Sequence, residues 1–105
     1  MNEKKAISLL GIAAKAGAVT SGGFLTERAV RNGTAKLVIV ATDASDNSYA
    51  DISHITYHYQ VPLVRFSTKD VLGHAIGKKD RICVAVLDQG LANAVAACIS
   101  DDATV

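Results

Sequence analysis

Apolar residues in the first third of the chain recur with helical spacing. Between residues 4 and 16 they fall on one face of a helix: Ala6, Leu9, Leu10 and Ala13. A short extended piece is expected at 18–20, then a second helix at 22–32 that Gly33 closes as a left-handed cap. Lys15 interrupts the first apolar segment and no small-residue cleavage site follows it, so we expect an amphipathic helix there and not a signal peptide.

Three continuous apolar runs predict strands: "KLVIVA" at 36–41, "VPLVRF" at 61–66 and "ICVAVL" at 82–87. The first is rich in β-branched residues and lacks polar alternation, which is typical of a strand covered on both faces. Pro62 stands at the start of the second run, where it does not break a hydrogen-bond ladder.

Helical patterns separate these runs. Ser45-Asp46 offers a cap for a third helix carrying Tyr49, Ile52, Ile55 and Tyr59 on one side. "STKD" at 67–70 predicts a short helix through about His74, with Gly73 and Gly77 interrupting any extension. Asp88 caps a last helix with Leu91, Ala94, Val95 and Cys98 on one side. The alternation predicts one α/β domain over residues 1–105, with helices on both faces of a central sheet.

Composition narrows the class of protein. A chain of 105 residues that is 50% hydrophobic can bury a continuous core without a metal or a disulfide. Cys83 and Cys98 lack the spacing of a redox motif or a metal site, so both are expected to be reduced core thiols of a cytoplasmic protein. No apolar run has the length of a membrane span.

Charge is uneven although the formal net charge is only +1. One basic group comprises Arg28, Arg31 and Lys36, and another comprises Lys78, Lys79 and Arg81. Each group lies beside an expected loop, where it could create a local positive field or could be ordinary solvated surface charge.

Gly22-Gly23 opens the second helix. Unpaired N–H groups at a helix N-terminus attract anions, and paired glycines let a phosphate backbone approach closely. Phe24 and Leu25 follow in the first turn, where apolar side chains by default pack into the core and otherwise lie exposed as a platform for a nucleobase. Arg28 falls on a nearby face.

Enzymatic patterns are weak. Asp43 follows a strand, as a phosphoacceptor would, but the early acidic pair that holds a cation is missing, so a loop-capping or RNA-adjacent role is favoured. His54 and His58 share a helix face without an evident third ligand, which favours a solvated face over a metal site. We expect no catalysis, no cofactor, no metal and no small-molecule substrate.

Three segments together carry a resemblance: "SGGFLTERAVRNGTAKLVIVATDAS", "VPLVRFSTKDVLGHAIGKKDR" and "CVAVLDQGLAN". The chain resembles the kink-turn-binding ribosomal protein family of the L7Ae type, and within it the small bacterial YlxQ-like branch, from about Ala6 to Ile99. The resemblance implies a three-layer α/β/α sandwich, a single domain with a central mixed sheet of about four strands. It also implies two elements that grip kink-turn RNA, namely the N-terminus of the second helix and the loop before the last strand.

The family's helix motif reads Gly-x-Asn-Glu-x-x-Lys, and Phe24-Leu25 replaces its base-reading Asn-Glu pair. The resemblance implies an RNA-binding set of Gly22, Gly23, Phe24, Leu25, Arg28, Lys36, Lys78, Lys79, Arg81 and Ile82. The expected partner is structured RNA, either ribosomal or kink-turn-like, with the ribosome or its proteins as further partners and no membrane. The alternative is a protein-interaction module in which Phe24 and Leu25 form an exposed apolar patch.

Overall fold

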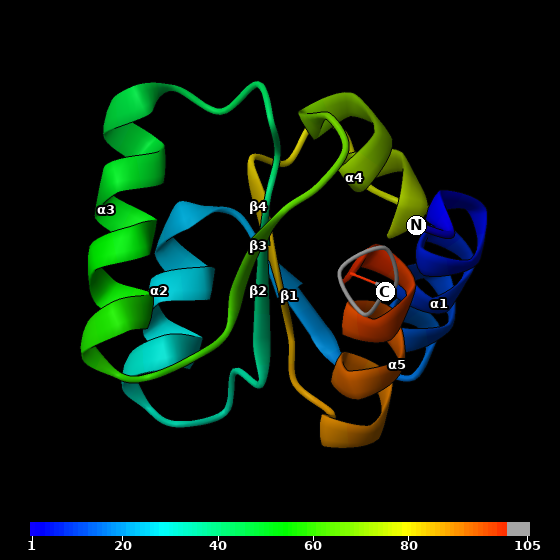
Figure 1. The fold of residues 1–105 in the computed structure, drawn as a ribbon, viewed down its shortest axis with the longest axis horizontal. Helices are drawn as coiled ribbons and strands as arrows, with labels where there is room; N and C mark the ends of the chain where they lie inside the picture. The colour runs from blue at the N-terminus through cyan, green and yellow to red at the C-terminus, as the bar shows by residue number, and fades with distance from the viewer. Residues whose placement is uncertain (101–105) are drawn as a thin grey trace.

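A four-stranded sheet lies between two layers of helices in the computed structural model, which describes residues 1–100 (Figure 1). The helices are α1 (Glu3–Lys15), α2 (Gly23–Arg31), α3 (Asp46–His58), α4 (Lys69–Ala75) and α5 (Gln89–Ser100). The strands are β1 (Val19–Ser21), β2 (Leu37–Val40), β3 (Leu63–Arg65) and β4 (Cys83–Val86). Helices α2 and α3 cover one face of the sheet, and α1, α4 and α5 cover the other (Figure 1).

The strand order is β1-β4-β2-β3. Strands β2 and β3 run parallel, whereas β4 is antiparallel to both β2 and β1. This confirms the expected sandwich with a mixed sheet of four strands. The register pairs Val40, the last residue of β2, with Cys83, the first of β4. The segments that follow β2 and precede β4 therefore meet at one end of the sheet.

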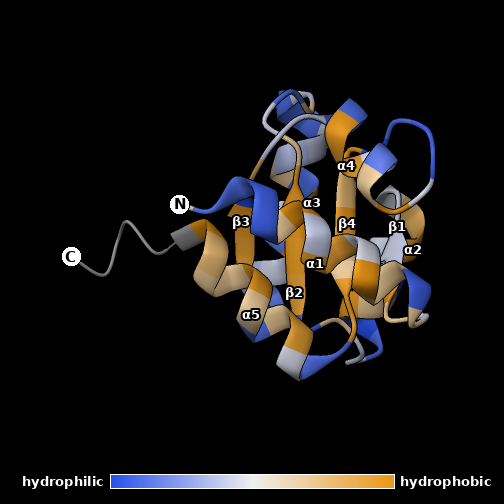
Figure 2. Ribbon diagram, turned by 90° about the vertical axis from the view of Figure 1, so that its right-hand side faces the viewer, coloured by the Kyte–Doolittle hydropathy of each residue, from blue (hydrophilic) through white to orange (hydrophobic). Residues whose placement is uncertain are grey.

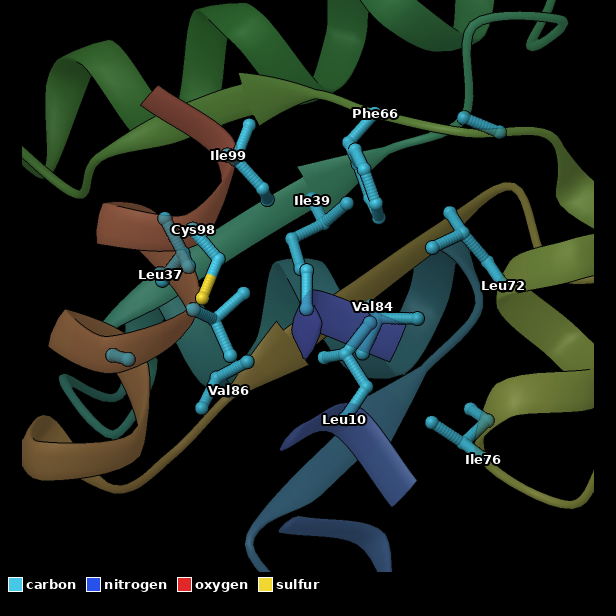
Figure 3. Packing of buried hydrophobic residues seen from close by; sticks show 14 residues of the cluster. Leu10, Leu37, Ile39, Phe66, Leu72, Ile76, Val84, Val86, Cys98 and Ile99 are labelled. Carbon is cyan, nitrogen blue, oxygen red and sulfur yellow. The ribbon is translucent and has the colours of Figure 1, made fainter. Parts of the chain in front are cut away.

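Side chains of β2 and β4 divide the core between the two layers. Leu37, Ile39, Val84 and Val86 pack toward α1, α4 and α5, as Figure 3 shows around Leu10 and Leu72. Alternate residues of the same strands pack toward α2 and α3: Val38, Val40, Cys83 and Ala85. Both strands are buried throughout and hydrophobic along their length (Figure 2), which confirms the prediction of strands covered on both faces.

Several helix ends follow the predicted caps. The Ser45 hydroxyl accepts a hydrogen bond from the Ser48 N–H at 3.1 Å and begins α3. The Asp88 carboxylate accepts one from the Leu91 N–H at 2.8 Å and begins α5. Gly33 has φ 80°, as expected of a left-handed residue after α2.

Three local expectations are wrong. Helix α4 is capped by Thr68, whose hydroxyl accepts from the Val71 N–H at 3.3 Å, and not by Ser67, which has φ 63°. Gly73 lies inside α4 and does not interrupt it. Tyr59 lies just after α3 and is 45% exposed, because the helix ends at His58.

Candidate functional site

The tip of α2, residues 22–25, presents backbone N–H groups that no side chain caps. Gly22 is the N-cap residue with φ 87°, a conformation that favours glycine, and its own N–H is bonded to the Cys83 carbonyl at 3.0 Å. The remaining first-turn N–H groups and the positive end of the helix dipole are available to an anion.

Phe24 and Leu25 project outward from this tip. Phe24 is 77% exposed and Leu25 is 46% exposed, so the default expectation of core packing is wrong for this pair. The reason is the phase of α2, which turns Thr26, Ala29 and Val30 toward the sheet. Residues on the opposite side of the helix are left in solvent.

The loop between α4 and β4, residues 77–82, rests on the backbone of α4. The Lys78 N–H donates to the Gly73 carbonyl at 2.8 Å. A Cβ added to Gly73 would lie 1.8 Å from the Lys79 carbonyl oxygen, so only glycine permits this contact. Sequence reasoning treated Gly73 as a helix breaker and missed this role, because the sequence does not show which backbone passes over a glycine.

Arg81 connects this loop to β1. Its Nε donates to the Ser21 hydroxyl at 3.0 Å, and its Nη1 donates to the Asp80 carbonyl at 2.9 Å. The loop is also joined to the start of α4, since the Arg81 N–H donates to the Lys69 carbonyl at 3.0 Å. The sequence alone did not indicate the contribution of Ser21.

Asp43 anchors the start of α4 in turn. Its Oδ1 accepts a hydrogen bond from the Lys69 N–H at 2.9 Å. This geometry agrees with the expected loop-capping role of Asp43. It also links the segment after β2 to the loop before β4 through Lys69.

The tip of α2 and the loop border one hollow of about 490 Å³, which we call the groove. The groove is lined by Leu25 of α2, Ala14 of α1, residues 19–21 of β1, and Ile76, Gly77, Lys78 and Arg81. Lys78 lines the groove and the adjacent Lys79 is also exposed, and within residues 1–100 neither ammonium group has an acceptor. The structure therefore brings the two sequence-predicted elements together.

Of the ten residues of the expected set, only Leu25, Lys78 and Arg81 line the groove. Phe24 and Arg28 lie on the outward side of α2, Gly22 and Gly23 form its N-terminus, and Lys79 belongs to the loop. The remaining two residues, Lys36 and Ile82, lie elsewhere. Lys36 sits at the opposite end of α2, where its Nζ donates to the Gly33 carbonyl at 3.3 Å, about 13 Å along the helix from Gly22. Ile82 is half-buried and packs against the core between the sheet and the layer of α2 and α3. Neither side chain lines the groove.

Cys83 lies under the tip of α2 and is fully buried. Cys98 is buried as well, with 8% of its surface exposed. Burial raises the pKa of the Cys83 thiol, and the nearby Thr26 hydroxyl acts in the opposite direction. The Thr26 hydroxyl is itself buried without a well-aligned hydrogen-bond partner in the described part of the chain. Both cysteines are unpaired thiols, as expected.

Neither a metal-binding cluster nor a membrane-spanning helix is found within residues 1–100. No group of three or more His, Cys, Asp or Glu side chains there is arranged to hold a metal ion. His54 and His58 are both exposed on α3. None of the helices there combines the length and the apolarity that crossing a bilayer requires.

Comparison with known proteins identifies the family. The model of the ribosomal protein L7Ae/L30e/S12e/Gadd45 family matches residues 4–96. The chain belongs to this family. Among members, it is 44% identical over 85 residues to RNA-binding protein YlxQ of Bacillus subtilis (strain 168), covering 81% of this chain and 85% of that protein. This confirms the resemblance to a YlxQ-like branch of the L7Ae family.

Two further relatives span most of the chain. RNA-binding protein YlxQ of Enterococcus faecium is 34% identical over 91 residues, which cover 87% of each protein. Large ribosomal subunit protein eL30 of Tetrahymena thermophila is 34% identical over 85 residues, covering 79% of this chain and 82% of its own length. Relatives named as RNA-binding proteins and as a ribosomal subunit protein thus share this sequence pattern.

Solved structures agree with the fold. A protein of unknown function from Bacillus halodurans C superposes with a TM-score of 0.89 at 35% identity, over 91% of this chain and 97% of that one. The Giardia lamblia 15.5kD RNA binding protein superposes with a TM-score of 0.77 at 27% identity, over 94% and 86% of the two chains. The L7Ae-type sandwich is therefore the fold of this chain.

Proposed function

We propose that this protein binds structured, sharply bent RNA in the groove between the tip of α2 and the loop at 77–82. The observation that carries the proposal is the geometry of Arg81, which is fixed to Ser21 at 3.0 Å and holds a basic loop beside the uncapped helix end. Lys78 of the loop and Leu25 of the helix tip then line the same hollow, with the adjacent Lys79 exposed. Such a surface suits phosphate oxygens.

Family membership supports RNA as the partner. Relatives of 44% and 34% identity carry the name RNA-binding protein YlxQ, and another relative is a large ribosomal subunit protein. We infer a non-enzymatic protein that acts with ribosomal or kink-turn-like RNA in the cytoplasm, in association with the ribosome or with translation. The groove supplies positioning groups for RNA and no catalytic constellation.

Phe24 and Leu25 are apolar, and this property limits how the protein can recognise RNA. Neither side chain can hydrogen-bond to a base edge, so discrimination of about 1–3 kcal/mol per polar base contact is lost at these positions. Recognition then depends on the shape of the RNA and on its phosphates, with apolar contact to unstacked bases or riboses. Gly22 and Gly23 admit the backbone because a Cβ is absent from both.

Charge reversal in the loop tests this proposal, and the chain offers a matched control. Lys78→Glu/Lys79→Glu reverses one Lys-Lys pair at the groove, and Lys4→Glu/Lys5→Glu reverses the other pair, at the far end of α1. Affinity for a kink-turn RNA, a duplex and an unrelated hairpin is measured at several salt concentrations. We expect the wild-type protein to prefer the kink-turn RNA and to bind less tightly as salt rises.

The groove variant should bind more weakly and show a salt slope smaller by roughly two, because two phosphate contacts are removed. The control variant should keep the wild-type slope. Equal loss in both variants would indicate a general field effect and would contradict binding in the groove.

A second candidate function is protein interaction on the same fold. The 77% exposure of Phe24 favours it, since exposed aromatic residues are enriched at protein interfaces. Absence of affinity for all three RNAs, together with a protein pull-down that depends on Phe24, would decide in its favour.

A further inference from the structure

The outward side of α2 carries a second hollow, of about 480 Å³, separate from the groove. It is lined by Phe24, Arg28, Arg31 and Asn32, which we call the outer hollow. The groove and the outer hollow share no lining residue, and the tip of α2 stands between them. Arg31 and Asn32 have no role in the function proposed above.

Helix geometry explains why these side chains gather. At about 100° per residue, Phe24, Arg28 and Arg31 fall within about 60° of arc on α2. The buried residues Thr26, Ala29 and Val30 occupy the opposite side. Leu25 points about 100° away from Phe24, toward the groove. Phe24 and Arg31 are about 10 Å apart along the helix axis, with Arg28 between them.

The charges in the outer hollow are available to a ligand. The Arg28 guanidinium has neither an acceptor nor an acidic partner within residues 1–100. Arg31 pairs with Glu27 at 3.7 Å, but the Arg31 side chain is 62% exposed. An exposed ion pair of this kind contributes little to stability, so a phosphate can replace the carboxylate as the partner of Arg31. No acidic residue lines the hollow among the described side chains.

Asn32 adds a directional group. Its Oδ1 accepts from the Thr34 N–H at 3.1 Å and from the Thr34 hydroxyl at 2.7 Å, which fixes the side chain. Its amide NH2 group then remains as a donor beside the two guanidinium groups. An exposed aromatic ring, the unpaired guanidinium group of Arg28, the weakly paired one of Arg31 and a fixed amide donor together match the base and the phosphate of a nucleotide.

We propose that the outer hollow binds one nucleotide of the RNA, with the base stacked on Phe24 and the phosphate held by Arg28 and Arg31. The RNA would then straddle the tip of α2, with one strand segment in the groove and another on the outward side of the helix. This inference rests on the proposed function, because it assigns a second subsite for the same RNA. A protein partner is disfavoured, since no acidic residue lines the outer hollow and its two guanidinium groups suit a phosphate.

Four single variants test the subsite with the kink-turn RNA used above. Phe24→Leu keeps an apolar side chain but loses the ring, and Phe24→Tyr keeps the ring. Arg31→Gln removes one charge from the outer hollow, and Lys4→Gln removes one charge from α1 on the other side of the sheet. Affinity is measured by fluorescence anisotropy at several salt concentrations, and thermal unfolding checks that each variant is folded.

We expect Phe24→Leu to weaken binding about tenfold, within the range for one stacked base, whereas Phe24→Tyr retains most of the affinity. Arg31→Gln should weaken binding and reduce the salt slope by about 0.7–0.9, the value for one phosphate contact. Lys4→Gln should match the wild-type protein.

Wild-type affinity in both Phe24→Leu and Arg31→Gln, with loss only in Lys78→Glu/Lys79→Glu, would overturn the outer subsite and leave the groove intact. Equal loss in Phe24→Leu and Phe24→Tyr would overturn base stacking. If the wild-type protein binds none of the RNAs, the function and the subsite both fail.

Discussion

Cys83 lies at the start of β4, directly beneath the glycine that begins the tip of α2. Burial raises the pKa of its thiol above the ordinary value of 9.0. The folded protein therefore holds this proton more tightly than the unfolded chain does. The stabilisation is complete below pH 9, and it is lost as pH rises through 9 toward the folded-state pKa.

Cys83→Ala removes this titration. We expect the free energy of unfolding of the wild-type protein to fall more steeply above pH 9 than that of the variant, although the variant is less stable at pH 7 because it leaves a small cavity. Urea denaturation from neutral pH to well above pH 9 measures both curves. Parallel curves would mean that the Cys83 thiol does not contribute to the loss of stability at alkaline pH.

Phe24 illustrates what sequence reasoning can resolve for a single side chain. The rule that apolar residues are buried predicted the wrong side, but the helical phase could have predicted exposure. Ala29 and Val30 are apolar and adjacent, and Thr26 lies three and four residues before them, so these three mark the inward face of α2. A ring almost opposite that face has no core to enter. Periodicity is therefore the stronger guide when it conflicts with residue type.

The helices and strands themselves were largely predictable, for identifiable reasons. Strands β2 and β4 were predicted because a strand buried on both faces needs an unbroken apolar run, and α3 and α5 because Ser45 and Asp88 supply their caps. Strand β3 is shorter than predicted and only half-buried, because it lies at the edge of the sheet. The predicted start of α4 was wrong because Ser67 adopts a positive φ, which is uncommon for serine and is not evident from the sequence.

The contact between α4 and the loop at 77–82 depends on Gly73, which predicts the effect of adding one carbon atom. In Gly73→Ala, the Cβ would collide with the Lys79 backbone, so the loop must move. We expect the free energy of unfolding to fall by about 1–3 kcal/mol, and RNA affinity to fall with it as Lys78 and Lys79 lose their positions. Urea denaturation and amide chemical shifts of the loop measure the two effects.

Gly23→Ala is the control for stability, because nothing lies within 4 Å of a Cβ at that position and its φ is not positive. This variant should be as stable as the wild-type protein or slightly more stable, since alanine favours a helix. Similar destabilisation in both variants would show that the close approach at Gly73 is not the cause.

At the scale of the whole molecule, the net charge of +1 conceals an asymmetric surface. The basic loop, the uncapped helix end and the outward arginines of α2 gather around one end of the sheet and along one helix. Sequence pattern identified these groups but not their proximity. Their proximity depends on the antiparallel pairing of β4 with β1 and β2, a long-range arrangement that only folding creates.

The groove also joins the two helical layers, because its lining comes from α1 and from Ile76, just after α4, on one side of the sheet and from α2 on the other. A ligand held there binds only the folded arrangement, so it must stabilise the whole domain by mass action. At an RNA concentration about 100 times Kd, the stabilisation is roughly 2.7 kcal/mol, which corresponds to a rise in Tm on the order of 10 °C for a domain of this size. Differential scanning fluorimetry with kink-turn RNA measures it. The rise should persist in Lys4→Glu/Lys5→Glu and shrink in Lys78→Glu/Lys79→Glu, whereas an equal rise in both variants would place the RNA outside the groove.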